Sequence, residues 1–227
     1  MVKKLSNISV IIRCKNEENW IGHAIQSVLD NLIKPEIIII DNGSTDKTLD
    51  IVKMFVEDPL LQNDSKNYTK IKIFKIRDYT PGKSLNLGVS KSTKKFIMFL
   101  SAHCVLKKFD ENEIIKKLKN FACLFGKQTP VWFGKKITKR YLWSHFDDEQ
   151  KINYFSNLEN RYFLHNALAI YNKNILKKFP FDPYLSTKED RYWAKKIVSK
   201  KLKFLYYPLL EADHHYTVGG NTWKGLG

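Results

Sequence analysis

The hydrophobic positions of the first hundred residues fall into short apolar runs that alternate with stretches of helical periodicity. The apolar or alternating runs cover residues 8–12, 37–40, 71–76 and 95–100. The stretches at helical spacing cover 21–32, 49–56 and 84–89. This alternation predicts an α/β fold with a mostly parallel central sheet flanked by helices, and ligands of such sheets bind at the carboxyl ends of the strands.

The pattern is less regular after residue 104. Residues 114–125 have helical spacing and predict a helix, whereas residues 126–149 are aromatic and basic and support no assignment. A strand over 166–171, a short helix over 172–179, a helix over 189–200 and a strand over 203–207 follow. The sequence has no internal repeat and no low-complexity linker, so we expect a single domain over residues 1–227.

The composition excludes several protein classes. Hydrophobic residues make up 43% and charged residues 27% of the 227 positions, which is typical of a globular domain rather than a disordered chain. The longest apolar runs are far shorter than the roughly 20 residues that cross a bilayer. The N-terminus lacks the pattern of a signal peptide, so we expect a cytoplasmic protein. Three cysteines without a CxxC pair argue against a disulfide framework.

The charge makes a polyanionic partner plausible. Lysine and arginine total 39 against 23 acidic residues, which gives a net charge of +16. Most of the excess is lysine scattered over predicted helices, a distribution that favours a solvated surface, and we expect no nucleic-acid partner. A basic surface would also suit an enzyme that works in peripheral contact with an anionic membrane at its inner face.

Polar residues gather where each predicted strand of the first half ends. They are Arg13, Asn16 and Glu17 after the first strand, Asp41 and Ser44 after the second, Arg77, Lys83 and Asn86 after the third, and Ser101 and His103 after the fourth.

Three stretches give the chain a family resemblance. SVIIRCKNEENWIGHAIQSVL, IIIIDNGSTDKTLDIV and KEDRYWAKKI occur in the order and at the separations typical of the family 2 glycosyltransferases, which the chain resembles from residue 8 to residue 225. The resemblance implies a GT-A fold and an inverting enzyme that moves a sugar from a nucleotide-sugar donor to a hydroxyl of a glycan or lipid-linked acceptor, in surface polysaccharide or glycolipid synthesis. It implies a nucleotide-binding half over about 1–106 and a smaller acceptor-side half with the tail over about 107–227.

The resemblance also assigns the donor site. By position in the family's motifs, the nucleotide-sugar-binding residues are Arg13, Asn16, Glu17, Asp41, Ser44, Arg77, Lys83, Asn86, Ser101 and His103. The turn at residues 41–46 has a plainer interpretation as a helix cap. For the segment around Lys83, a turn that starts a helix is about as good an interpretation as direct donor contact.

The stretch KEDRYWAKKI carries the expected catalytic acids. The resemblance implies that Asp190 is the general base, with Glu189 beside it, and inversion requires a base opposite the leaving diphosphate. The alternative is that both acids only complement the start of a helix. Trp193 follows one helical turn later and is the expected acceptor-binding aromatic.

The chain departs from the family's pattern at the fourth strand end. It has Ser101-Ala102-His103 in place of the usual metal-binding Asp-x-Asp, and the tail supplies His214 and His215. Two alternatives follow for His103 with one of the tail histidines. They hold a divalent metal, for which imidazole favours Mn²⁺ over Mg²⁺, or they neutralise the diphosphate directly.

Two other functions remain on the residues alone. A sugar nucleotidyltransferase could use a related fold, but residues 14–17 lack the glycine-rich loop that holds a triphosphate. A noncatalytic basic module that binds nucleic acid or membrane is supported only by the charge.

Overall fold

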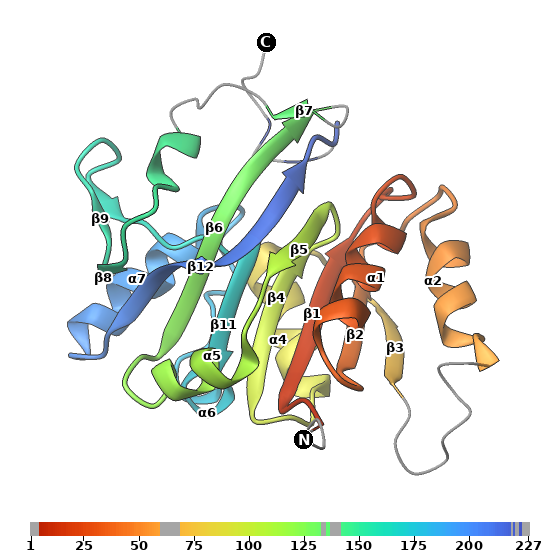
Figure 1. Cartoon of the computed structure of the whole chain (residues 1–227), viewed down its shortest axis with the longest axis horizontal. Helices are drawn as coiled ribbons and strands as arrows, with labels where there is room; N and C mark the ends of the chain where they lie inside the picture. The colour runs from red at the N-terminus through yellow and green to blue at the C-terminus, as the bar shows by residue number, and fades with distance from the viewer. Residues whose placement is uncertain are drawn as a thin grey trace.

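The protein is described here by a computed structural model that covers residues 5–59, 69–132, 135–136, 142–218, 220 and 223. Figure 1 shows one twisted sheet with helices on both of its faces. The strands lie in the order β3-β2-β1-β4-β11-β6-β12-β5. None of the helices within these ranges is long and apolar enough to cross a membrane.

The first half of the chain forms the parallel part of the sheet. The strands are β1 (Ile8–Cys14), β2 (Glu36–Asp41), β3 (Lys70–Lys75) and β4 (Phe96–Ser101), and all their mutual pairings are parallel. The connecting helices are α1 (Ile21–Asn31), α2 (Thr48–Val56) and α4 (Pro81–Lys91). Each of these strands and helices agrees with the sequence-based prediction to within a few residues.

The second half adds the antiparallel part. Its main elements are β5 (Cys104–Lys108), α5 (Glu111–Lys117), β6 (Cys123–Trp132), β11 (Leu168–Asn172), α6 (Lys173–Lys178), α7 (Glu189–Ser199) and β12 (Phe204–His215). Short elements lie between β6 and β11: β7 (Lys135–Lys136), the 3-10 helix η1 (Trp143–His145), β8 (Lys151–Ile152), β9 (Phe155–Ser156) and β10 (Arg161–Tyr162). β11 is antiparallel to β4 and β6, whereas β12 runs parallel to β6, so the complete sheet is mixed.

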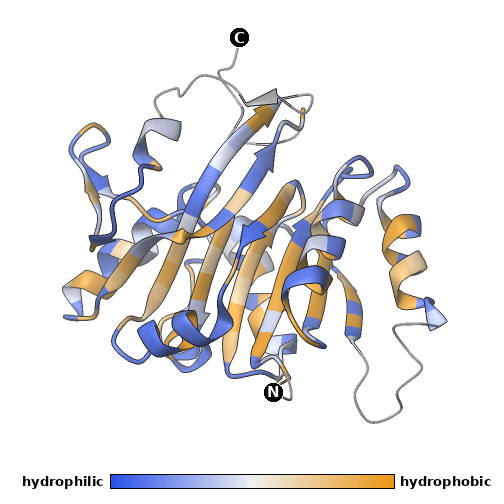
Figure 2. Cartoon of the chain, viewed as in Figure 1, coloured by the Kyte–Doolittle hydropathy of each residue, from blue (hydrophilic) through white to orange (hydrophobic). Residues whose placement is uncertain are grey.

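Two apolar cores sandwich the sheet because successive side chains of a strand point to opposite faces. On β1, Val10 and Ile12 join the core under α1, α2 and α5, while Ile11 joins the core under α4, α6 and α7. The central strands therefore read as continuous apolar runs, and in Figure 2 they form the most hydrophobic bands of the molecule.

Two predictions for the second half were wrong. The helix expected over 114–125 ends at Lys117, and the chain continues as the ten-residue strand β6. Leu124 faces one core and Phe125 the other, and a short apolar run that is buried on both sides cannot be distinguished from a buried helix by periodicity. The strand expected over 203–207 extends to His215, so both tail histidines belong to the sheet.

A close contact ties the two halves together. A Cβ at Gly82 would lie 2.0 Å from the carbonyl oxygen of Asp182, so this backbone approach requires glycine. The Thr80 hydroxyl donates to the Pro183 carbonyl over 2.7 Å and also caps α4 by accepting from the Lys83 amide. The start of α4 is thus fixed against the loop that leads into α7.

Candidate active site

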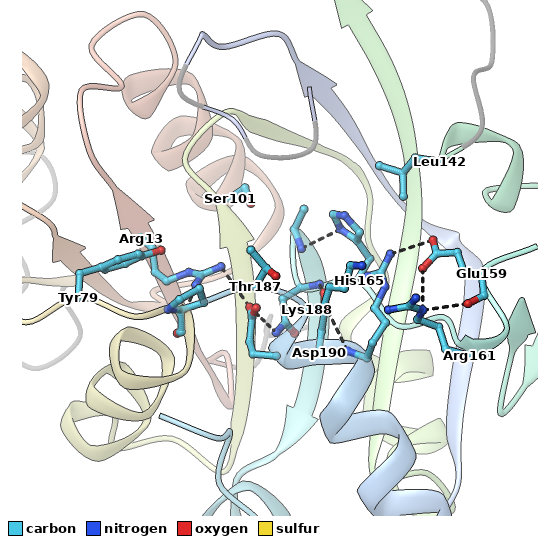
Figure 3. A pocket seen from close by; sticks show the side chains of 15 residues that line it. Arg13, Tyr79, Ser101, Leu142, Glu159, Arg161, His165, Thr187, Lys188 and Asp190 are labelled. Carbon is cyan, nitrogen blue, oxygen red and sulfur yellow. Dashed lines mark hydrogen bonds and ion pairs between the residues drawn. The ribbon is translucent and has the colours of Figure 1, made fainter. Parts of the chain in front are cut away.

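A pocket of about 530 Å³ opens at the carboxyl ends of β1 and β4. Four of the predicted site residues line it: Arg13, Ser101, Glu189 and Asp190. In Figure 3, Arg13 and Tyr79 lie on one side of the pocket, Glu159 and Arg161 lie on the other, and Asp190 lies between them. Arg13 belongs to β1 and Tyr79 follows β3. Glu159 and Arg161 come from the segment before β11, and Asp190 comes from α7.

Arg13 joins the pocket to both halves of the chain. Its guanidinium lies 3.3 Å from the Pro81 carbonyl and 3.4 Å from the Ser84 hydroxyl, which orient it from α4. Its Nη2 lies 3.7 Å from Oε1 of Glu189 at the start of α7. A guanidinium held in this way at one side of the pocket is suited to bind an anionic group of a ligand.

Asp190 is held by several donors. Its Oδ2 accepts from the Asn166 amide at 3.1 Å and from Nη1 of Arg191 at 3.1 Å, and its Oδ1 accepts from the Arg191 amide. The residue is 7% exposed, and it still lines the pocket. These bonds fix one orientation of the carboxylate, which a general base requires.

The surroundings of Glu189 shift its titration. Burial and the neighbouring Asp190 charge raise the pKa of Glu189, and the Arg13 guanidinium opposes that shift. A carboxyl group whose pKa is perturbed in a pocket is typical of a functional site.

The sequence did not point to several residues of the pocket. His165 and Asn166 precede β11, Glu159 and Arg161 flank β10, and Arg191 follows the predicted acid pair. Arg191 is buried, its guanidinium lies 4.4 Å from the Phe163 ring centre, and it donates to the Leu164 carbonyl. A basic residue directly after an acid pair was the only signal in the sequence, and it is a weak one.

His165 is fixed in one neutral form. The Ala167 amide donates to its Nδ1, so the ring proton sits on Nε2, and Gln128 Nε2 donates to the same Nδ1 at 3.0 Å. The Gln128 carbonyl oxygen then accepts from His214 Nδ1 at 2.8 Å. Burial and the Arg191 charge lower the pKa of His165 to about 3. His165 therefore faces the pocket as a neutral side chain whose Nε2 can donate.

The loops after β1 and β2 hold each other. The Asn16 side chain accepts from the Thr45 amide at 2.8 Å, and the Asn16 amide donates to the Ser44 hydroxyl at 3.1 Å. Asn16 has a φ of 54°, a left-handed conformation that asparagine tolerates well. The two loops that were predicted to bind the nucleotide thus form one hydrogen-bonded unit.

Asp41 holds the turn after β2 and does not cap α2, which begins at Thr48 with Lys47 as its N-cap. It is fully buried, and its two carboxylate oxygens accept from the amides of Gly43 and Ser44. The expected direct contact between Asp41 and a nucleotide is not available in this conformation, because no part of the side chain reaches solvent. Asp41 instead shapes the turn that presents Ser44.

Glu17, His103 and His214 gather at the end of β4. Glu17 Oε1 lies 2.9 Å from His103 Nδ1, and the His103 and His214 rings are 4.8 Å apart. Glu17 Oε2 and His214 Nε2 are both buried without a hydrogen-bond partner among the described residues. Their chemistry fits a divalent ion that accepts nitrogen and oxygen ligands, such as Mn²⁺. In the ranges the structure covers, no three His, Cys, Asp or Glu side chains stand ready to hold a metal ion.

The structure separates the two tail histidines. Adjacent side chains of a strand face opposite sides, so only one of the two rings can lie against the His103 ring. That ring belongs to His214, which is fully buried, whereas the His215 ring stacks on Trp20 at a centroid distance of 3.9 Å. The His215 backbone amide donates to the His103 carbonyl at 2.8 Å, so His215 contacts His103 through its backbone rather than through its ring.

The prediction that Trp193 binds the acceptor was wrong. It is 2% exposed, packs edge-on against Tyr171 and donates from its indole to the Phe179 carbonyl. A side chain in the core cannot offer a face to an acceptor sugar. The helix begins at Glu189, which turns Trp193 inward and leaves the preceding residue, Tyr192, 53% exposed.

The predicted residues around α4 also lie apart from the pocket. The Asn86 amide bonds to both the carbonyl and the amide of Phe181, so it is a structural link rather than a donor contact. Lys83 pairs with Asp78, and Arg77 is exposed. Neither basic residue lines the pocket as the structure describes it.

The sequence profile of Glycosyl transferase family 2 matches residues 9–179. The chain belongs to this family. The resemblance derived from the three motifs is confirmed, and family membership favours a glycosyltransferase over a nucleotidyltransferase. The match ends before Glu189, so it does not itself include the predicted catalytic acids.

Curated proteins are similar to this family 2 chain over part of its sequence. The minor teichoic acid biosynthesis protein GgaA of Bacillus subtilis is 36% identical over 100 residues, which are 41% of this chain and 21% of that protein. The matched segments cover only 13% to 21% of the lengths of such curated relatives.

Solved structures confirm the predicted α/β fold of the GT-A type. TarS of S. aureus, residues 1–349 in complex with UDP-GlcNAc, has a TM-score of 0.70 at 19% identity, over 96% of this chain and 61% of that one. GalNAc-T7 with UDP, GalNAc and Mn²⁺ has a TM-score of 0.71 at 16% identity, over 96% of this chain and 45% of that one. At such identities the likeness concerns the fold alone.

Proposed function

We propose that this family 2 chain transfers a sugar, with inversion, from a nucleotide sugar to a hydroxyl of a glycan or lipid-linked acceptor. The observation that carries the proposal is the position of Asp190, which is oriented by Asn166 and Arg191 in a pocket whose opposite wall is the strand-end edge with Arg13 and Ser101. We call the strand ends with Arg13 and Ser101 the donor edge. A carboxylate that lies between this edge and the open side of the pocket can take a proton from an incoming acceptor hydroxyl.

The donor would lie across the ends of β1, β2 and β4. The Asn16–Ser44 unit and Ser101 offer polar groups there, and Arg13 offers a cation for the diphosphate. TarS binds UDP-GlcNAc and GalNAc-T7 binds UDP on the same fold, which supports a nucleotide-sugar donor. GgaA takes part in minor teichoic acid synthesis, which supports an acceptor in a surface polymer.

The proposed reaction uses the positions of these residues. The acceptor hydroxyl gives its proton to Asp190 while its oxygen attacks the anomeric carbon, and the bond from that carbon to the diphosphate oxygen breaks. Attack opposite the leaving group inverts the configuration. Arg13 would stabilise the negative charge that develops on the diphosphate, and the Nε2–H of His165 is free to donate to a ligand oxygen in the pocket.

A divalent ion would be held by His103 and His214, with Glu17 beside them. GalNAc-T7 contains Mn²⁺, and the unpartnered Glu17 Oε2 and His214 Nε2 have the chemistry of ligands. When bound, the ion would neutralise the leaving diphosphate. Binding of Mn²⁺ alone, measured by calorimetry, should be lost in His214→Ala and kept in His215→Ala.

A nucleotide-sugar panel tests the proposal. UDP-, GDP- and CDP-sugars are incubated with the chain, with Mn²⁺ or with chelator, and thermal unfolding is recorded. One nucleotide class should stabilise the protein, by about 2.7 kcal/mol at a hundredfold excess over Kd. The same donor should then release nucleoside diphosphate when a glycan acceptor is added. Release of pyrophosphate from a nucleoside triphosphate, or stabilisation by no nucleotide sugar, would contradict the proposal.

Contact with an anionic membrane remains a prediction from the net charge of +16.

A further inference from the structure

A second cleft continues the pocket on the side away from Arg13. It measures about 380 Å³ and shares Arg161 and Arg191 with the first pocket. Its walls come from β9, β10 and the exposed face of α7, which packs against β10. In Figure 3 Asp190 lies between Arg13 on one side and Arg161, which lines both the pocket and the cleft, on the other.

Aromatic rings form one component of the cleft. Phe155 is 44% exposed and Tyr192 is 53% exposed, and the Phe155 and Tyr162 rings meet edge-on at 5.4 Å. Large aromatic side chains are normally buried, so rings that stay exposed together in a concave site indicate a binding surface. Their apolar faces suit the flat side of a sugar ring.

Positive charge forms the other component. Arg161, Arg191 and Lys195 line the cleft, and none of its lining residues in the described part of the chain is acidic. Arg191 is engaged by Asp190 and the Leu164 carbonyl, while Arg161 Nε bonds to the Glu159 carbonyl. The Glu159 carboxylate lies between the two guanidiniums at 3.6 and 3.7 Å. Lys195 pairs with no carboxylate among the described residues, so the cleft carries a surplus of positive charge.

We propose that this cleft binds an anionic unit of the acceptor chain, which places the hydroxyl of the next unit at Asp190. This inference rests on the proposed function and specifies its acceptor: a glycan that carries phosphodiester or carboxylate groups. The sugar ring stacks on Tyr192 and Phe155, and Lys195 and Arg161 hold the anion. A neutral glycan would leave the Lys195 charge uncompensated and would bind less tightly.

The test measures binding of three oligosaccharides of equal length to the complete chain by calorimetry. One is neutral, one is linked by phosphodiesters and one contains uronic acids, so that the last two separate the two sources of negative charge. We expect at least one anionic oligosaccharide to bind about tenfold more tightly than the neutral one. Equal affinity for all three would overturn the proposal.

Two variants locate the binding. Lys195→Gln should weaken binding of the anionic chain about tenfold, whereas Lys200→Gln, which removes the same charge at the exposed end of the same helix, should change it less than twofold. Tyr192→Ala should weaken the anionic and neutral chains alike. Equal effects of Lys195→Gln and Lys200→Gln would overturn the proposal, as would binding of anionic lipid vesicles through Lys195 without any binding of glycans.

The donor gives an independent readout. Affinity for the nucleotide sugar should stay unchanged in Lys195→Gln and Tyr192→Ala, because neither side chain lines the pocket beside Arg13. Normal donor binding with no preference for anionic chains would refute the cleft and leave the proposed function intact. If the wild-type chain bound no nucleotide sugar, the proposed function itself would be refuted.

Discussion

The two edges that face each other across the pocket are built in different ways. On the donor edge, polar side chains of the β1 and β2 loops accept from backbone amides of the β2 loop, as Asn16 does from Thr45 and Asp41 from Ser44. On the acceptor edge, Asp190, Arg191 and His165 are oriented toward a cavity that is partly open. The first edge is a pair of loops already held together by hydrogen bonds, which leaves their backbone and remaining polar groups for a ligand. The second edge presents charged side chains directly to the cavity.

This difference predicts which substitutions affect chemistry and which affect folding. The Asp41 carboxylate of the donor edge should contribute to stability, because both of its oxygens already accept hydrogen bonds from backbone amides. The carboxylate at Asp190 should contribute to turnover. The predictions that follow set one edge against the other.

The largest effect is expected at Asp190. Asp190→Asn keeps the shape of the side chain but cannot accept the proton, so the rate of transfer should fall by about 10² to 10⁴. Nucleotide-sugar affinity should stay close to the wild-type value. Glu189→Gln is the matched control, and it should retain more activity than Asp190→Asn. A rate for Asp190→Asn above about a third of the wild-type rate would remove Asp190 from the role of base.

On the donor edge, Asp41→Ala should reduce stability rather than remove one ligand contact. The carboxylate accepts from two backbone amides in a fully buried turn, and hydrogen bonds to charged groups contribute about 1.5 to 3 kcal/mol. Urea unfolding should show a loss of that size. An unchanged free energy of unfolding, together with lost nucleotide affinity, would return Asp41 to the direct role that the sequence suggested.

The contact that joins the edges can be broken at Gly82. Gly82→Ala would push a Cβ into the Asp182 carbonyl, and such overpacking costs about 1 to 3 kcal/mol. Gly22→Ala on α1 is the matched control, because its Cβ would meet side-chain atoms rather than backbone: a methyl of Ile51 at 3.2 Å and the ring of Phe55 at 3.8 Å. Thermal unfolding of both variants decides the point. Equal stability of the two would show that the α4 contact is looser than described.

The sequence was sufficient where local pattern and burial agree. β1, β2 and β4 are apolar runs buried on both faces, and the loops after them carry motifs that fixed the family. It was insufficient for β6 and β8, whose pairings with β11 and β12 depend on partners far along the chain, and for the two-residue strands β9 and β10, which are too short to show a pattern. Arg191 and His165 were missed for the same reason, since their role depends on Gln128, Phe163 and Leu164.

Trp193 and Tyr192 show how fine that limit is. Both are aromatic residues on α7, and only the helix phase decides that one packs in the core and the other faces the cleft. A motif gives the residue types near a site, but a shift of about 100° per residue selects the one that faces the ligand.

The smallest effect concerns pH and the acceptor edge. The unfolded chain protonates His165 below about pH 6.5, whereas in the folded protein its pKa is lowered to about 3. Stability should therefore be full above pH 6.5 and fall as the pH drops, by about 1 kcal/mol between pH 7.5 and 5.5 in the presence of chelator.

Urea unfolding at the two pH values measures this loss. His165→Gln should reduce the pH dependence by that amount, and His23→Gln, a change at an exposed histidine on α1, should leave it as in the wild type. Identical pH profiles for wild type and His165→Gln would contradict the neutral state of His165.

A crystal structure of the chain with its preferred nucleotide sugar tests most directly whether the donor edge and Asp190 meet across one pocket. We expect a nucleoside over the ends of β1 and β2, with the anomeric carbon facing the Asp190 carboxylate and room for one hydroxyl between them, since reacting atoms approach to about 3 to 3.5 Å. A sugar bound with its anomeric carbon turned away from Asp190, or a nucleotide seated in the cleft beside Tyr192, would contradict it.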